Sequence, residues 1–154
     1  MRKTIFVSGA FLLLNLLFIA GLAQEKEKNK DKDQPKIEGS GNVITKDVAV
    51  QSFEELEAKG IFNVILTQGS KEAVKIEAED NLQQLFEVKN EGKKLIVSMK
   101  KDSHFNSHQK MIVYITFKNL KSMDLKMVGN LTTEGNLNFQ DLSLENKSVG
   151  SVDL

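Results

Sequence analysis

Apolar and polar residues alternate along most of the chain after Ile37. Apolar side chains occupy every second position in four runs, 62–66, 74–78, 95–99 and 111–117. Successive side chains of a β-strand point to opposite faces, so each run predicts a strand with one buried face. The residues predicted to point inward are Phe62, Val64, Leu66, Val74, Ile76, Ala78, Leu95, Val97, Met99, Met111, Val113, Ile115 and Phe117.

Glycine-containing segments separate these runs. Segment 68–71 lies between the first two runs and segment 90–92 precedes the third. Glycine supplies the positive φ that tight turns need, so both segments are predicted to be hairpin loops. One short helical turn is expected where Asp80 can cap a segment that carries Leu82 and Leu85, followed by Phe86.

An internal repeat is visible in the C-terminal third of the chain. Segment 121–131 (KSMDLKMVGNL) aligns with segment 142–152 (LSLENKSVGSV) after a shift of 21 positions. The shift pairs Ser122 with Ser143, Met123 with Leu144, Asp124 with Glu145, Lys126 with Lys147, Val128 with Val149 and Gly129 with Gly150. Short coils that stack and share a core produce such a repeat. We expect an all-β chain with a hairpin-rich N-terminal part leading into a short right-handed β-solenoid; an antiparallel β-sandwich or meander is the alternative.

The N-terminus has the pattern of a targeting segment. Arg2 and Lys3 precede an apolar stretch over residues 5–19, and Gly21-Leu22-Ala23 places small residues at a cleavage site. This pattern predicts a signal peptide over residues 1–23, cleaved before Gln24. The alternative, an uncleaved anchor, would need about 20 apolar residues to span a bilayer.

The charged segment that follows is predicted to be a flexible leader over residues 24–36. Its sequence, QEKEKNKDKDQPK, holds no apolar side chain to bury. Asp31 and Asp33 resemble the start of a calcium loop, but Pro35 and the missing glycine and glutamate break that pattern. The third segment, residues 37–154, is then a single β domain.

Composition removes several classes of function. The 154 residues include 21 basic and 21 acidic side chains, so no basic excess indicates nucleic-acid binding. Cysteine is absent, which excludes disulfides, thiolate metal sites, thiol catalysis and a lipid anchor on cysteine.

Several short segments carry a family resemblance. Residues 39–43 (GSGNV) open a strand, Phe53 precedes a second, and residues 60–69 read GIFNVILTQG. Residues 77–82, 92–95 and 115–120 follow in a matching order. Together, over residues 37–154, these segments resemble the putative auto-transporter adhesin, head GIN domain family. The resemblance implies an exported bacterial β-solenoid domain, frequent in the Bacteroidetes and usually with more coils, that acts as an adhesin.

Candidate chemistry is sparse. His104 and His108 lie four residues apart with only Asp102 near them, so no metal site is expected. Ser103, Ser107 and Ser151 lack the surroundings of a nucleophile. Segment 39–41 lacks the third glycine of a dinucleotide loop.

A carboxylate pair on an outer sheet face could cleave a polysaccharide. The candidate carboxylates are Asp47, Glu77, Glu79, Asp80, Asp124 and Glu145. Asp124 and Glu145 occupy equivalent places in the repeat, yet Lys126 and Lys147 follow each of them, so neutralising pairs are expected rather than catalysis. Tyr114 is expected to face outward from its strand, and Phe105 is expected to lie in a loop. Both aromatic side chains could then support a contact surface. Asn130 and Asn146 begin glycosylation sequons but are interpreted as turn residues.

The sequence therefore favours an exported, non-catalytic module, in the periplasm, at the cell surface or secreted. No catalytic, cofactor or metal residues are expected, and no binding residues are assigned. The partner is expected to be a protein or glycan of the cell envelope, with no nucleic acid and no membrane span after cleavage. Alternatives are a polysaccharide-acting enzyme and a component of an envelope sensor. The unpaired edge of the last strand near Val149 is expected to allow association with a second copy or a partner strand.

Overall fold

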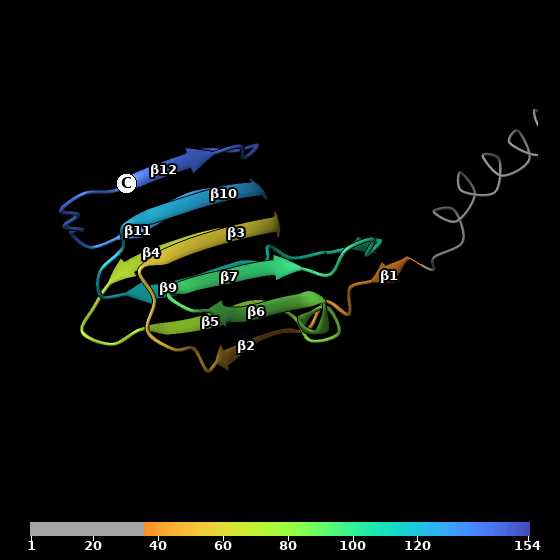
Figure 1. Cartoon of the computed structure of the whole chain (residues 1–154). Helices are drawn as coiled ribbons and strands as arrows, with labels where there is room; N and C mark the ends of the chain where they lie inside the picture. The colour runs from red at the N-terminus through yellow and green to blue at the C-terminus, as the bar shows by residue number, and fades with distance from the viewer. Residues whose placement is uncertain (1–35) are drawn as a thin grey trace, which may run out of the picture. The chain divides into compact units, whose positions relative to one another are not determined.

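The computed structural model describes residues 36–154, which form two five-stranded sheets and one two-stranded pair (Figure 1). The first sheet has the order β12 (Ser143–Asn146), β10 (Ser122–Val128), β3 (Glu55–Ile61), β7 (Lys94–Met99), β6 (Phe86–Glu91). The second has the order β11 (Leu131–Glu134), β4 (Asn63–Gln68), β9 (Ile112–Phe117), β5 (Ala73–Glu79), β2 (Val43–Val48). β1 (Ile37–Glu38) pairs with β8 (Phe105–Asn106). The predicted signal peptide and all of the predicted leader except Lys36 lie outside the described residues.

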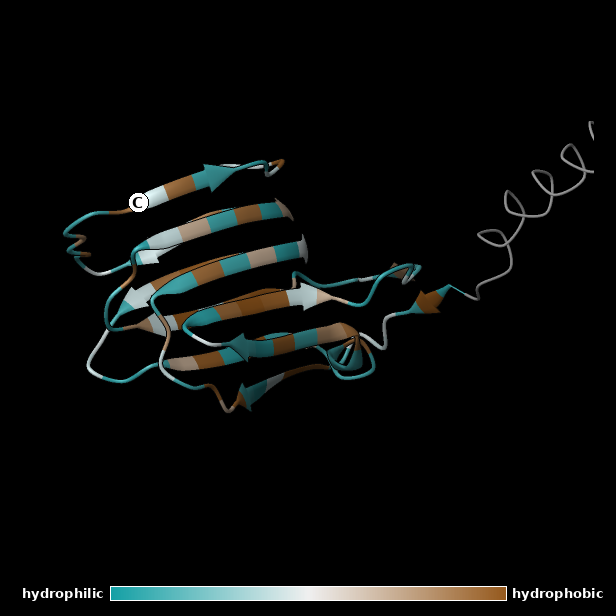
Figure 2. Cartoon of the chain, viewed as in Figure 1, coloured by the Kyte–Doolittle hydropathy of each residue, from teal (hydrophilic) through white to brown (hydrophobic). Residues whose placement is uncertain are grey.

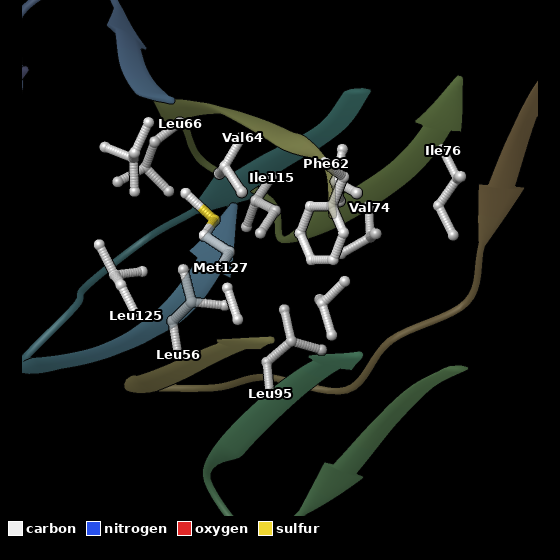
Figure 3. Packing of buried hydrophobic residues seen from close by; sticks show 14 of the residues in the cluster. Leu56, Phe62, Val64, Leu66, Val74, Ile76, Leu95, Ile115, Leu125 and Met127 are labelled. Carbon is white, nitrogen blue, oxygen red and sulfur yellow. The ribbon is translucent and has the colours of Figure 1, made fainter. Parts of the chain in front are cut away.

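The period-two pattern places the core between the two sheets. Figure 2 shows alternating hydrophilic and hydrophobic bands along the strands. The inward side chains of both sheets form one cluster, in which Leu56, Leu95 and Leu125 of the first sheet face Val64 and Ile115 of the second (Figure 3). All thirteen residues predicted to point inward are in contact with this cluster, and only Met99 is partly exposed.

The predicted 21-residue repeat is confirmed by the pairing of β10 with β12. The two strands are parallel, with Ser122 beside Ser143, Met123 beside Leu144 and Asp124 beside Glu145. Beyond β12, Val128 bridges to Val149, also in parallel. β3 lies parallel to β10 on its other side. These strands therefore do not form an antiparallel meander, and both sheets are mixed and open.

One of the two predicted hairpins is present. β6 and β7 pair antiparallel around a turn in which Gly92 has φ 59°. The hairpin predicted at segment 68–71 is wrong, because β9 lies between β4 and β5. The Gly69 N–H donates to the Phe117 carbonyl at 2.8 Å, so the β4–β9 ladder continues where the turn was expected.

The predicted helical turn is present, but its predicted cap is wrong. The 3₁₀ helix η2 (Gln83–Leu85) begins after Leu82 and has no side-chain cap. The Asp80 carboxylate instead accepts hydrogen bonds from Ser40, Asn42 and the Asn81 N–H. The prediction for Phe105 is also corrected, since it belongs to β8 rather than to a loop.

Candidate functional site

The strand register brings three copies of a nine-residue pattern side by side. The copies are 56–64 (LEAKGIFNV), 123–131 (MDLKMVGNL) and 144–152 (LENKSVGSV). Met123 lies between Leu56 and Leu144, and Leu131 lies between Val64 and Val152. Sequence reasoning found the second and third copies and missed the first, which lies 67 residues before the second. The shared order of acid, any residue and lysine (EAK, DLK, ENK) is the signal that could have found it.

The second and fourth positions of the pattern form a surface that we call the acid–lysine ladder: Glu57, Asp124 and Glu145 beside Lys59, Lys126 and Lys147. The Lys126 Nζ donates to Asp124 Oδ2 at 2.5 Å, and Lys147 forms an ion pair with Glu145. The hydrogen bond to Asp124 raises the pKa of Lys126. Burial lowers this pKa, while the negative charges of Glu57 and Glu145 raise it further. The predicted neutralising pairs are therefore confirmed.

The sixth position of the pattern forms a second surface, the apolar row, which consists of Ile61, Val128 and Val149. Adjacent members are register partners, and their side chains are 51%, 51% and 71% exposed. An open cavity of about 350 Å³ adjoins Ile61 and Val128 and is also lined by Phe105. Neighbouring strands are about 4.8 Å apart, so the three side chains form a nearly continuous apolar strip.

The eighth position of the pattern forms the amide row, Asn63, Asn130 and Ser151, directly beside the apolar row. The Asn130 N–H donates to Asn63 Oδ1 at 2.9 Å, and the Ser151 N–H donates to Asn130 Oδ1 at 3.0 Å. The asparagine side chain of one copy thus accepts a hydrogen bond from the backbone N–H at the same position of the next copy. Gly129 and Gly150 precede these residues, and a Cβ at either glycine would overlap the backbone carbonyl of the copy beneath it.

A buried carboxylate at the end of β5 joins three segments of the chain. Glu79 is fully buried and is the only buried charged side chain among residues 36–154. It accepts hydrogen bonds from the Gly41 N–H at 2.7 Å, the Ser107 hydroxyl at 2.7 Å and the His108 N–H at 3.1 Å. The Ser107 hydrogen bond has the largest effect and lowers the pKa of Glu79; burial opposes it, and the two backbone N–H groups reinforce it. A Cβ at Gly39 would overlap this carboxylate, which explains a glycine in the GSG segment.

The two histidines have different surroundings. The His108 Nδ1 lies 3.3 Å from Glu79 Oε1, whereas the His104 carbonyl accepts the Ile37 N–H at 2.8 Å. Residues 36–154 contain no group of three His, Asp or Glu side chains placed to hold a metal ion. Asp31 and Asp33 lie outside the described residues.

The remaining candidates have structural partners. Ser103 donates to the Lys100 carbonyl, while Ser107 donates to Glu79 and Gln109. Asp47 forms an ion pair with Lys75.

Tyr114 lies in β9 and donates its hydroxyl to Glu77 at 3.2 Å. Burial and this hydrogen bond raise the pKa of Tyr114.

Of the two sequon asparagines, Asn130 belongs to the amide row. Asn146 lies in β12 and accepts the Ser148 N–H at 2.9 Å.

Comparison with solved structures gives relatives described as putative adhesins. A putative adhesin from Bacteroides fragilis has 31% identity and a TM-score of 0.72, over 76% of this chain and 55% of that one. A putative adhesin from Parabacteroides merdae has 18% identity and a TM-score of 0.57, over 72% of this chain and 55% of that one. A putative lipid binding protein from Parabacteroides distasonis has 16% identity and a TM-score of 0.53, over 77% of this chain and 65% of that one. The last two show the fold alone.

The chain therefore spans a little over half the length of the solved adhesin relatives. No curated protein matches it. Within the described residues, no helix has the length and apolar character needed to cross a membrane. Residues 52–154, which include all three copies of the pattern, match the family described as putative auto-transporter adhesin, head GIN domain, and the chain belongs to this family.

Proposed function

We propose that this chain is an exported, non-catalytic, adhesin-like module that binds a protein of the cell envelope or surface through the apolar row. The exposure of three stacked aliphatic side chains carries the proposal, since contiguous exposed apolar surface is typical of interaction sites. The adjoining amide row supplies polar groups at the rim. A row of aliphatic side chains favours a protein over a sugar, because a pyranose ring stacks on aromatic faces.

The three parallel copies support a further part of the proposal, that the chain forms a short β-solenoid. Successive copies are joined, at the corner between the two sheets, by the same kind of hydrogen bond from a backbone N–H to an asparagine side chain. A solenoid presents equivalent side chains at one spacing along its length, which suits an extended binding strip.

The acid–lysine ladder argues against the polysaccharide-acting alternative. A glycosidase needs one carboxylate that is free to ionise and a second that can carry a proton. Asp124 and Glu145, the stacked pair that the sequence offers, are each held in an ion pair with lysine.

A binding assay with the purified chain on immobilised cell-envelope extract tests the proposed function. The double variant Ile61→Thr with Val128→Thr keeps β-branched side chains but removes apolar surface, and we expect it to bind at least tenfold more weakly. Val43→Thr changes another exposed aliphatic side chain, 40% exposed on β2 and outside the apolar row, and serves as the control. Binding should be lost when the extract is treated with protease. Binding that survives protease but is lost after periodate oxidation of sugars would overturn a protein ligand.

A further inference from the structure

Lysine side chains border the apolar row along the strands that carry it. On β3, Lys59 and Ile61 point to the same exposed face, and Lys126 and Val128 repeat this arrangement on β10. Two residues of a strand span about 7 Å, so each lysine lies directly beside an aliphatic side chain. The acids of the acid–lysine ladder lie two residues farther from the row. The nearest charge to the row on each strand is therefore positive.

Lys110 supplies a further positive charge at the cavity beside the row. It lines the cavity of about 350 Å³ together with Ile61 and Val128. It also lines a second open hollow, of about 230 Å³, together with Asn63 and Asn130 of the amide row. Within the part of the chain that the structure describes, no other charged residue lines either hollow. An apolar side chain that enters the cavity is thus placed next to a cation.

The described part of the chain neutralises neither Lys59 nor Lys110. The ion pairs within residues 36–154 include neither of them, whereas Lys126 is held in one. Segment 100–110, which contributes one wall of the cavity, carries three lysines and one aspartate. A partner that covered these lysines with apolar surface alone would remove their hydration without replacing it. Carboxylates on the partner avoid this cost and complement the charge.

We propose that the partner presents a segment that is both apolar and acidic. An aliphatic or aromatic side chain of this segment fills the cavity at Ile61, and acidic side chains beside it pair with Lys59 and Lys110. The inference rests on the proposed function and names the chemistry of its protein partner. The chain's own segment 24–36 carries acids but no apolar side chain, so it does not fit this description.

Selection from a phage-displayed library of random peptides on the purified chain tests this chemistry. We expect the natural chain to enrich peptides in which leucine, isoleucine or phenylalanine lies close to aspartate or glutamate. The double variant Lys59→Glu with Lys110→Glu should enrich the same apolar residues beside lysine or arginine, because both charges are reversed. Lys71→Glu reverses an exposed lysine that follows the far end of β4 and should keep the acidic preference.

The affinity of the most enriched acidic peptide gives the second readout. The double charge variant should bind it at least tenfold more weakly, and added salt should weaken binding to the natural chain more than to the variant. Thermal unfolding should show that all variants keep the fold. Enrichment of no peptide, equal enrichment of acidic and basic peptides, or an acidic preference that persists in the double charge variant would overturn the inference. The proposed function is decided separately, by the binding of the Ile61→Thr with Val128→Thr variant to envelope extract.

Discussion

Two glycines of the repeat set how closely successive copies approach. Gly129 has φ 148° and Gly150 has φ 143°, and each faces the backbone carbonyl of the copy beneath it. Phe62 takes the equivalent place in the first copy, so the glycine requirement begins with the second. The corner is therefore limited by backbone contact rather than by side-chain packing.

Replacing Gly129 with alanine should destabilise the fold strongly. The new Cβ would overlap the Phe62 carbonyl oxygen, and we expect a loss of about 3 kcal/mol or more, typical of severe steric substitutions. Gly135→Ala is the matched control, because Gly135 also has positive φ, 80°, but no neighbour within 4 Å. Its cost should be about 1–2 kcal/mol from the backbone alone. Thermal unfolding measures both; equal losses would contradict the proposed backbone contact.

The buried Glu79 should make stability fall in acid. Its pKa is lower in the folded chain than the ordinary value of 4.5, chiefly through Ser107, so its ionised form stabilises the fold above that value. This contribution is lost as the pH falls through the lowered pKa. Glu79→Gln should lower Tm by several degrees near pH 7, because an amide cannot accept all three hydrogen bonds. The difference from the natural chain should shrink as the pH falls below 4.5 and through the lowered pKa.

Thermal unfolding across this pH range checks the Glu79 prediction. Glu87→Gln, on an exposed position of β6, is the control and should change Tm little. A Glu79→Gln difference that stays constant or widens in acid would contradict the prediction.

The histidines should contribute little to stability. The His108 side chain is 52% exposed, and its removal leaves the hydrogen bonds from the Gly41 N–H, the Ser107 hydroxyl and the backbone N–H of residue 108 to Glu79 in place. Changing His104 and His108 together to alanine should therefore lower Tm by only a few degrees, with no effect of a chelator on either protein. A large loss that a chelator reproduces in the natural chain would show that a metal site had been missed.

At the scale of elements, local patterns predicted where the strands lie in the sequence better than they predicted which strands pair. The alternation of residues 62–66 and 111–117 determines which face is buried, and both predictions are confirmed. Segment 68–71 also marks the end of a strand correctly. Nothing local indicates that β9, more than 40 residues later, enters between β4 and β5. The parallel partner of β10 was predicted only where the repeat made the register visible.

The candidate surfaces were predicted less completely, for the same reason. The pairing of Asp124 with Lys126 is visible locally, and its stacking on Glu145 follows from the repeat. The sequence does not distinguish Glu79 from the other candidate carboxylates, because its hydrogen-bond partners Gly41 and Ser107 are 38 and 28 residues away along the chain.

The two sides of β12 should exchange amide hydrogens at different rates. The N–H groups of Leu144 and Asn146 should exchange fast, because they point away from β10. Those of Lys147 and Val149 should exchange more slowly, because they donate to Leu125 and Met127. Exchange measured by NMR resolves individual amides. Equal rates on both sides of the strand would contradict the pairing of β12 with β10.

At the scale of the whole molecule, the compartment depends on residues outside the described part. Family membership and adhesin relatives agree with an exported protein. The N-terminal pattern predicts how export occurs, and cysteine is absent from the cleavage point and from the rest of the chain. A domain without disulfides must obtain its stability from the core between its sheets and from the stacked copies.

The N-terminal pattern makes a prediction that protein chemistry can decide. The two positions that a signal peptidase inspects hold small residues, Gly21 and Ala23. The peptidase should therefore cut before Gln24 and release a chain that begins with the charged leader. Removing residues 1–23 takes away two basic and no acidic side chains, so the released chain should also be slightly acidic. Mass spectrometry of the protein isolated from its native host gives the first residue directly. Ala23→Leu should block cleavage, while Ala20→Leu, outside the two inspected positions, should not. A chain that retains Met1 and remains with the membrane would contradict the prediction.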